Sequence, residues 1–176
     1  FLSDALTLEA GKEIEKAVAE KKPFYLNMAH YAVHSPFETD ERFISHYTDP
    51  NKSQQARAFA TLIEGMDKSL GDILDKLEDM GIAENTLIIF LGDNGGDAPL
   101  GDAADYGSSA PFKGKKGSEY EGGVRVPFIV SWAHPNPNNK FQKAYPIARN
   151  AIQTQMGTVM DIYPTVLSVA GVKPAP

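Results

Sequence analysis

Cysteine is absent from the 176 residues of this chain, and its absence excludes several kinds of chemistry. A chain without thiols holds no disulfide and no thiolate zinc site, and it offers no cysteine nucleophile. Long apolar runs are also missing, because the longest have the length of a strand and a membrane-spanning helix needs roughly 18 such residues. We therefore expect no membrane span within these residues.

Basic residues are outnumbered by acidic ones, which gives the chain a formal net charge of −6. This balance argues against a surface that binds nucleic acid by releasing counterions. One segment differs, since it gathers basic side chains among glycines: Lys113, Lys115, Lys116 and Arg125. Such a segment suits the binding of an anion, and a solvated basic loop is the alternative interpretation.

Two long amphipathic helices are predicted. Residues 7–21 have apolar side chains at helical spacing, and Pro23 forces this helix to end. Residues 53–80 carry one continuous apolar stripe, with Ser53 as N-cap and Gly81 just beyond the last turn. Shorter helices are predicted over residues 40–47 and from about residue 162 onward.

Three strands are predicted between these helices. Residues 24–29 and 86–91 are mostly apolar and β-prone, as strands covered on both faces are. Residues 124–132 form the third strand, in which Pro127 indicates an edge position or the start of the strand. Since helices and strands alternate, the chain is expected to be α/β, with crossover connections in a mostly parallel sheet.

Asp93 and Asn94 follow the second predicted strand directly and are flanked by glycines. A carboxylate and an amide oxygen are hard ligands suited to Ca²⁺ or Mg²⁺. The carboxyl ends of strands are also where open α/β sheets place their active sites. A tight turn is the alternative interpretation, because Asp-Asn-Gly is ordinary turn chemistry.

Two further groups of polar residues lie beside predicted strands. His30 and His34 follow the first strand, and Lys116 precedes the third. Because the carboxyl ends of parallel strands lie at one edge of a sheet, we expect a cation site, a histidine and a lysine to meet around one anion. His30 is expected to be structural, and the alternative for His34 is that it only caps its loop.

Three segments in a fixed order resemble the second half of the sulfatase catalytic domain. They are Pro-Phe-Tyr-Leu…Val-His-Ser-Pro within residues 23–36, Thr-Leu-Ile-Ile-Phe-Leu-Gly-Asp-Asn-Gly-Gly at 86–96, and Gly-Lys-Lys-Gly-Ser-Glu-Tyr-Glu-Gly-Gly-Val-Arg-Val-Pro at 114–127. The similarity includes residues 2–7 and 161–167, so it spans nearly the whole chain. It implies an alkaline-phosphatase-like fold, a mostly parallel three-layer sheet with helices on both faces. Residues 1–176 are expected to form a single, incomplete part of that domain.

The resemblance implies one Ca²⁺ ion and two of its ligands. Asp93 and Asn94 match the Asp-Asn pair that binds the ion, and Gly92 stands where the family has a serine that is not expected to ligate. The remaining ligands are expected outside this chain.

The resemblance also implies two side chains that contact the sulfate ester and take part in catalysis. His34 matches the histidine of a Pro-His-x-Pro loop, although Val33 replaces its first proline. Lys116 matches the lysine of a Gly-Lys-Gly segment. Lys115 occupies the preceding glycine position, so the choice between Lys115 and Lys116 stays open.

The activity implied is that of a sulfuric ester hydrolase acting on a sulfated small molecule or carbohydrate. The family's nucleophile is formylglycine, made from a Cys or Ser in a Cys/Ser-x-Pro-Ser-Arg motif that this chain lacks. We expect this motif in an N-terminal half of the same domain, and we expect the present chain alone to be inactive. A secreted or periplasmic location is implied for the longer protein.

Two alternatives to a sulfatase stay open. A phosphomonoester or phosphonate hydrolase of the same superfamily handles similar anions, although Asn94 stands where a two-metal phosphatase often has a histidine after the aspartate. The other alternative is a non-catalytic module that binds anions. The sequence decides neither the sulfate ester nor the oligomeric state.

Overall fold

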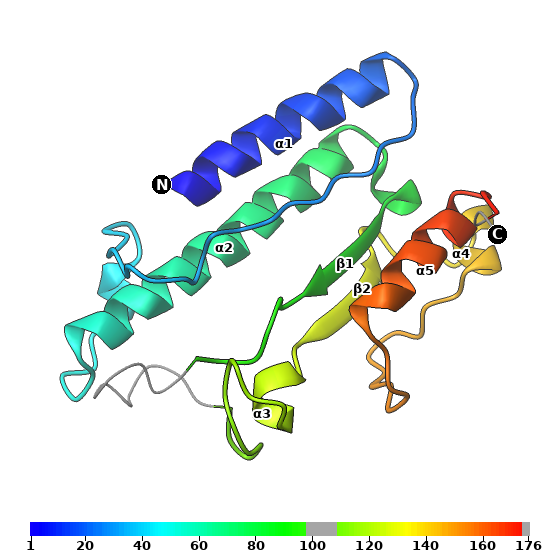
Figure 1. Cartoon of the computed structure of the whole chain (residues 1–176). Helices are drawn as coiled ribbons and strands as arrows, with labels where there is room; N and C mark the ends of the chain where they lie inside the picture. Colours follow the sequence, from blue (N-terminus) through cyan, green and yellow to red (C-terminus); the bar gives the residue numbers. More distant parts are fainter. Residues whose placement is uncertain (98–108, 174–176) are drawn as a thin grey trace.

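The computed structural model describes residues 1–97 and 109–173. Helices α1 (Leu2–Ala19) and α2 (Gln54–Asp79) lie side by side as one layer, and strands β1 (Leu87–Leu91) and β2 (Phe128–Trp132) lie beside that layer (Figure 1). The shorter helices are α3 (Glu121–Val124), α4 (Lys140–Ala144) and α5 (Ile162–Val169), with 3-10 turns at Ile44–His46, Ala83–Asn85 and Val159–Asp161.

Local signals account for the bounds of α2. The Ser53 side chain accepts a hydrogen bond from the backbone N–H of Ala56, which caps the first turn. Gly81 has φ of +67°, the left-handed conformation that ends many helices. The prediction of a helix over residues 53–80 is therefore confirmed within one residue at each end. Helix α1 begins five residues before its predicted start.

The core lies between α1 and α2, next to the 3-10 turn Ala83–Asn85 that precedes β1. Ile14 and Leu77 are each only 1% exposed, and they pack with the buried side chains of Ala10, Ile73 and Ala83. Met28 and Ile88 cover this cluster from the side of the strands. The helices are also joined by an ion pair between Glu15 and Lys76, so apolar and polar contacts both fix the helical layer.

The two strands pair antiparallel, with Ile89 opposite Val130. The expectation of parallel neighbours is wrong for this pair, because β2 runs back along β1 in the opposite direction. The predicted strand start at residues 124–127 is also wrong: residues up to Val124 form α3, and β2 begins directly after Pro127. Trp132 ends β2 with 4% exposure, as expected for a core side chain.

Residues 24–29 were predicted as a strand. They run extended along the helical layer but pair with no strand of the described structure (Figure 1). Within the described residues, no backbone hydrogen bond involves this segment, and Tyr25 is 69% exposed. A β-strand is defined by its pairing, so the β propensity of the segment is not sufficient to form one here. Among the helices of the described part, none has the length and apolar character needed to cross a membrane.

Candidate metal and anion site

The Asp93–Asn94 turn follows β1 and presents oxygen atoms to solvent. Both residues are exposed. Oδ1 of Asp93 accepts a hydrogen bond from the Asn94 backbone N–H at 2.9 Å, and the Asn94 side-chain NH₂ donates to the Gly95 carbonyl at 2.9 Å. The side-chain nitrogen of Asn94 is thus used in a hydrogen bond to the backbone, and the side-chain oxygen Oδ1 is not part of that bond. The turn therefore offers both a carboxylate and an amide oxygen.

The lysine loop is bound to this turn through the backbone. The N–H of Lys116 donates to the Gly96 carbonyl at 2.9 Å, and the N–H of Gly95 donates to the Gly123 carbonyl at 2.9 Å. A third bond, from Gly92 to the Pro127 carbonyl at 3.2 Å, continues the β1–β2 ladder into the loops. In an antiparallel pair the end of one strand lies beside the start of the next. The Asp-Asn turn and the lysine loop are therefore two sides of one connection.

Close backbone packing explains the glycines of this connection. A Cβ atom at Gly95 would lie 2.0 Å from the Gly122 carbonyl oxygen, and one at Gly122 would lie 2.2 Å from the Gly114 oxygen. Gly114 also has φ of +85°, which side chains disfavour. The glycine-rich composition is thus a packing requirement that holds the lysine loop against the Asp-Asn turn.

The four basic side chains of the loop differ in their partners. Lys115 pairs with Asp97 at 3.6 Å, Arg125 pairs with Glu121 at 3.0 Å, and Lys113 lies over the Tyr120 ring at 3.9 Å. Lys116 is half-buried, and no ion pair is recorded for it within the described part of the chain.

His34 lies in a separate hollow of about 390 Å³, between its own loop and the start of α1. The side chain is exposed, and its Nδ1 lies 2.9 Å from the Ser35 carbonyl oxygen. No contact recorded in residues 1–97 or 109–173 joins it to Asp93 or Lys116. The structure thus joins the loop of Lys116 to the turn of Asp93 and Asn94 through the backbone, and it records no such bond for His34.

His30 is half-buried, and its Nδ1 has no hydrogen-bond partner in the described structure. Burial lowers the pKa of the His30 imidazole, because the charged form is poorly solvated there. The neutral ring is therefore favoured, in keeping with the structural role expected from the sequence.

The donor set fits part of a calcium site. Carboxylate and amide oxygens are suitable ligands, but Ca²⁺ takes about six to eight of them. In the described residues, no three His, Cys, Asp or Glu side chains form a group that could hold a metal ion. Asp93 and Asn94 thus provide two oxygen atoms of the kind that Ca²⁺ accepts, fewer than a complete site needs.

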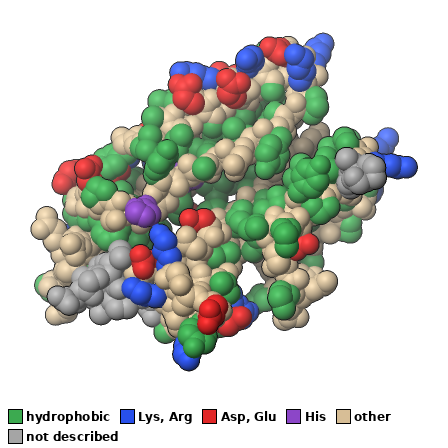
Figure 2. Space-filling model, in the orientation of Figure 1, with side chains coloured by type: hydrophobic (Ala, Val, Ile, Leu, Met, Phe, Trp, Pro, Cys, Tyr) green, Lys and Arg blue, Asp and Glu red, His purple; other side chains and the backbone are tan. Residues whose placement is uncertain are grey.

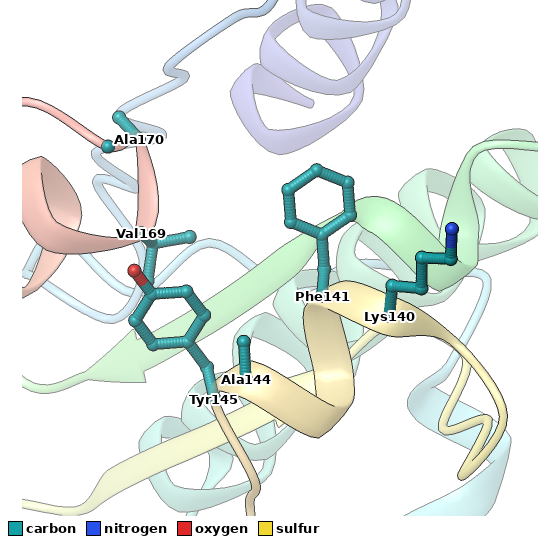
Figure 3. Close-up of a pocket in the computed structure, with 7 residues that line it drawn as sticks. Lys140, Phe141, Ala144, Tyr145, Val169 and Ala170 are labelled. Carbon is teal, nitrogen blue, oxygen red and sulfur yellow. The ribbon is translucent and has the colours of Figure 1, made fainter.

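Sequence reasoning missed two features of these loops and a second hollow. Gly96 and Asp97 anchor the lysine loop, and the signal for them was their place directly after the Asp-Asn turn. A largely apolar hollow of about 420 Å³ lies between α4 and α5, lined by Phe141, Tyr145 and Val169 (Figure 3). It contains none of the predicted site residues.

The Asp93–Asn94 turn and the lysine loop lie at the ends of two paired strands in a chain of helices and strands. The family model for Sulfatase matches residues 1–172, so the chain belongs to the sulfatase family.

Curated relatives agree with this placement. The chain is 33% identical over 173 residues to N-acetylgalactosamine-6-sulfatase of Mus musculus, covering 98% of this chain and 30% of that protein. It is 32% identical over 173 residues to steryl-sulfatase of Homo sapiens, covering 97% of this chain and 26% of that protein. The chain therefore spans less than a third of the length of these relatives.

Solved structures give the fold. The crystal structure of Ps i-CgsB in complex with k-i-k-neocarrahexaose has a TM-score of 0.85 and 28% identity, covering 99% of this chain and 35% of that chain. PsFucS1 sulfatase from Pseudoalteromonas sp. has a TM-score of 0.73 and 30% identity, with coverages of 97% and 30%. The fold of this chain is thus that of part of a sulfatase, the alkaline-phosphatase-like fold expected from the sequence.

Proposed function

We propose that this chain is the part of a sulfuric ester hydrolase that supplies two ligands of a calcium site and two side chains that bind the sulfate group. The observation that carries the proposal is the hydrogen bond from the Lys116 N–H to the Gly96 carbonyl, which ties the lysine loop to the Asp-Asn turn. The names of relatives at about 30% identity support sulfatase chemistry over other anion-binding functions.

In the proposed reaction, a nucleophile attacks sulfur, the ester S–O bond breaks and an alcohol or phenol leaves. Asp93 and Asn94 would hold Ca²⁺, which supplies positive charge beside the sulfuryl oxygens. Lys116 adds a second positive charge that needs no rearrangement during the reaction, an electrostatic role that lowers the barrier. His34 or Lys116 gives a proton to the leaving oxygen.

The remaining parts of the reaction are assigned to polypeptide outside this chain. The sequence has no cysteine and no Cys/Ser-x-Pro-Ser-Arg motif, so the formylglycine nucleophile would come from an N-terminal half of the same domain. We therefore propose that residues 1–176 form one incomplete domain and are inactive alone. The substrate would be a sulfated small molecule or carbohydrate, and the longer protein would be secreted or periplasmic.

Hydrolysis of p-nitrophenyl sulfate by the full-length gene product tests the roles of the lysines. We expect Lys116→Ala to lower kcat/KM by on the order of 100-fold, as removal of one electrostatic stabiliser does in other hydrolases. Lys115→Ala is the matched control, because its ammonium pairs with Asp97, and we expect a change of about threefold or less.

Three outcomes would contradict the proposal. If Lys115→Ala has the larger effect, the assignment of the lysines is reversed. If both Lys116→Ala and His34→Ala keep near-normal turnover, their proposed roles are wrong. Faster hydrolysis of p-nitrophenyl phosphate than of the sulfate by the unaltered protein would favour the phosphoesterase alternative.

A further inference from the structure

Lys116 lies in a four-residue β-turn that runs from Lys115 to Ser118. The backbone N–H of Ser118 donates to the Lys115 carbonyl at 3.0 Å, which closes the turn. Gly117 has φ of +84°, and a positive φ at the third position is typical of a type II turn. Lys116 is therefore the second residue of the turn, and the conformation of the turn sets the direction in which its side chain leaves the backbone.

The hydroxyl of Ser118 adds two further bonds across the same turn. Its Oγ accepts a hydrogen bond from the Lys115 backbone N–H at 3.1 Å and donates to the Lys115 carbonyl at 2.8 Å. A β-turn is often closed by a single backbone bond, and many turns have none. Both bonds of the hydroxyl go to the backbone of Lys115, so they do not depend on the side chain at position 115.

This hydroxyl lies in a closely packed part of the lysine loop. Ser118 is half-buried, and a Cβ atom at Gly123 would lie 2.8 Å from its Oγ. The Gly123 carbonyl accepts from the Gly95 N–H at 2.9 Å, and the Lys116 N–H donates to the Gly96 carbonyl at 2.9 Å. The turn that Ser118 closes is therefore tied at two points to the segment that follows the Asp-Asn turn.

A lysine ammonium depends strongly on the backbone that carries it. The charge stands at the end of a flexible four-carbon stem, and ordering such a stem costs side-chain entropy. Lysine and arginine side chains lie at the surface around α3, the helix that follows this turn, with acidic side chains among them (Figure 2). Little packing restrains a stem at a surface, so the turn determines which region the ammonium of Lys116 can reach.

We propose that Ser118 is a positioning residue for Lys116. Its hydroxyl holds the turn in the conformation that directs the Lys116 ammonium to the sulfate group, and it does not contact the substrate itself. This inference rests on the role proposed above for Lys116 and adds a second residue to that role. The alternative is that the hydroxyl only stabilises the fold.

A double-mutant cycle in the full-length gene product separates these two roles, with p-nitrophenyl sulfate as substrate. We expect Ser118→Ala to lower kcat/KM by about 10-fold, because a displaced charge stabilises the transition state poorly. In the Lys116→Ala background the same substitution should lower kcat/KM by less than about twofold, since its effect acts through the missing ammonium. Equal fold-changes in the two backgrounds would overturn the proposal.

Ser131→Ala is the matched control. Ser131 is also half-buried, and its hydroxyl donates to the Trp132 carbonyl at 2.9 Å within β2. We expect this variant to keep kcat/KM within about twofold of the unaltered protein, although it too loses a serine hydroxyl. A fall as large as that of Ser118→Ala would show that the effect is not specific to the turn, and the proposal would be wrong.

Ser118→Thr tests the hydroxyl itself, because threonine keeps the oxygen that bonds to Lys115. We expect this variant to retain most of the turnover that Ser118→Ala loses. A threonine variant with the Tm of the unaltered protein and the low kcat/KM of Ser118→Ala would contradict the proposal.

Amide hydrogen exchange tests the turn without measuring activity. The Lys116 N–H donates to the Gly96 carbonyl, so its exchange reports whether the turn stays in place. In full-length Ser118→Ala we expect this amide to exchange at least about 10-fold faster than in the unaltered protein. The amide of Ala133, which donates to the Thr86 carbonyl beside the β1–β2 ladder, should be unchanged. An unchanged Lys116 amide would overturn the proposal.

The kinetic outcomes also distinguish this inference from the proposed function. Near-normal turnover by Lys116→Ala would contradict the proposed function, whatever the effect of Ser118→Ala. Slow turnover by Lys116→Ala, together with equal effects of Ser118→Ala in both backgrounds, would contradict only the role of Ser118.

Discussion

The helical layer and the segment after β2 use apolar residues in opposite ways. In α1 and α2, the side chains of Ile14 and Leu77 are almost completely buried. Between α4 and α5, by contrast, Ile152 is 93% exposed, Met156 is 89% exposed and Met160 is 76% exposed. Hydrophobic burial therefore stabilises the first region and contributes little to the second.

This difference separates a region that has a buried core from a region in which large apolar side chains stay exposed. The helical layer buries part of its apolar stripe, including Ile73 and Leu77 of α2, whereas Ile63 is 42% exposed. The later segment is held mainly by single polar contacts, such as the Tyr145 hydroxyl donating to the Ser168 carbonyl and Arg149 donating to the Pro135 carbonyl. The exposed side chains of Ile152, Met156 and Met160 therefore add little hydrophobic stabilisation to this segment.

The largest expected effect contrasts the two regions directly. Leu77→Ala should lower the free energy of unfolding by about 3 kcal/mol, because it leaves a cavity among buried side chains. Ile152→Ala should change it by less than about 0.5 kcal/mol in this chain. Urea denaturation of both variants measures the difference. Similar losses for the two would show that the exposed segment is packed in solution.

The second prediction concerns the ionic contacts that tie the helical layer to the loop after residues 24–29. Asp40 is 2% exposed, and its carboxylate accepts a hydrogen bond from Nε of Arg42 at 2.9 Å. Arg42 also pairs with Asp4 of α1 at 3.0 Å. The hydrogen bond from Arg42 lowers the pKa of the Asp40 carboxyl. This contact therefore stabilises the fold above the ordinary aspartate pKa, and its contribution is lost as the pH falls below that value.

Arg42→Gln should lower the thermal stability at pH 7, because it leaves the Asp40 carboxylate without its cation. The difference from the unaltered chain should shrink as the pH is lowered from 5 to 2, since Asp40 then becomes protonated in both proteins. Thermal unfolding across this pH range measures it. Arg57→Gln is the control, because Arg57 donates to the Tyr47 carbonyl and its cost should not depend on pH. A pH-independent cost for Arg42→Gln would contradict the assignment.

Local signals made the helical layer predictable from the sequence. The bounds of α2 follow from the Ser53 cap, the left-handed Gly81 and the apolar stripe, all of which lie within the helix or next to it. Strand pairing depends on distant residues, so residues 24–29 could be recognised as extended but not as unpaired. The same reason explains why the antiparallel direction of β1 and β2 was not predicted.

The candidate site was likewise predictable only in part. The Asp93–Asn94 turn and the lysine loop could be identified by motif, and their mutual contact was expected from their place at one edge of the sheet. The contact itself comes from glycine backbone packing, such as Gly95 against Gly122, which no residue spacing reveals. The position of His34 depends on how its loop packs against α1, and the loop sequence alone does not determine that packing.

The smallest expected effect tests whether the helical layer can be strengthened without any new contact. Gly71 lies inside α2, and a Cβ atom there would meet nothing within 4 Å. Gly71→Ala should raise the free energy of unfolding by about 0.5–1 kcal/mol, through the higher helix propensity of alanine. Gly11→Ala in α1 is the matched variant, because its Cβ would lie 3.1 Å from the Lys76 side chain that pairs with Glu15. The gain there should be smaller, since Lys76 must move. Chemical denaturation of the two variants measures the order, and a larger gain for Gly11→Ala would show that the two helices are less closely packed than their contacts indicate.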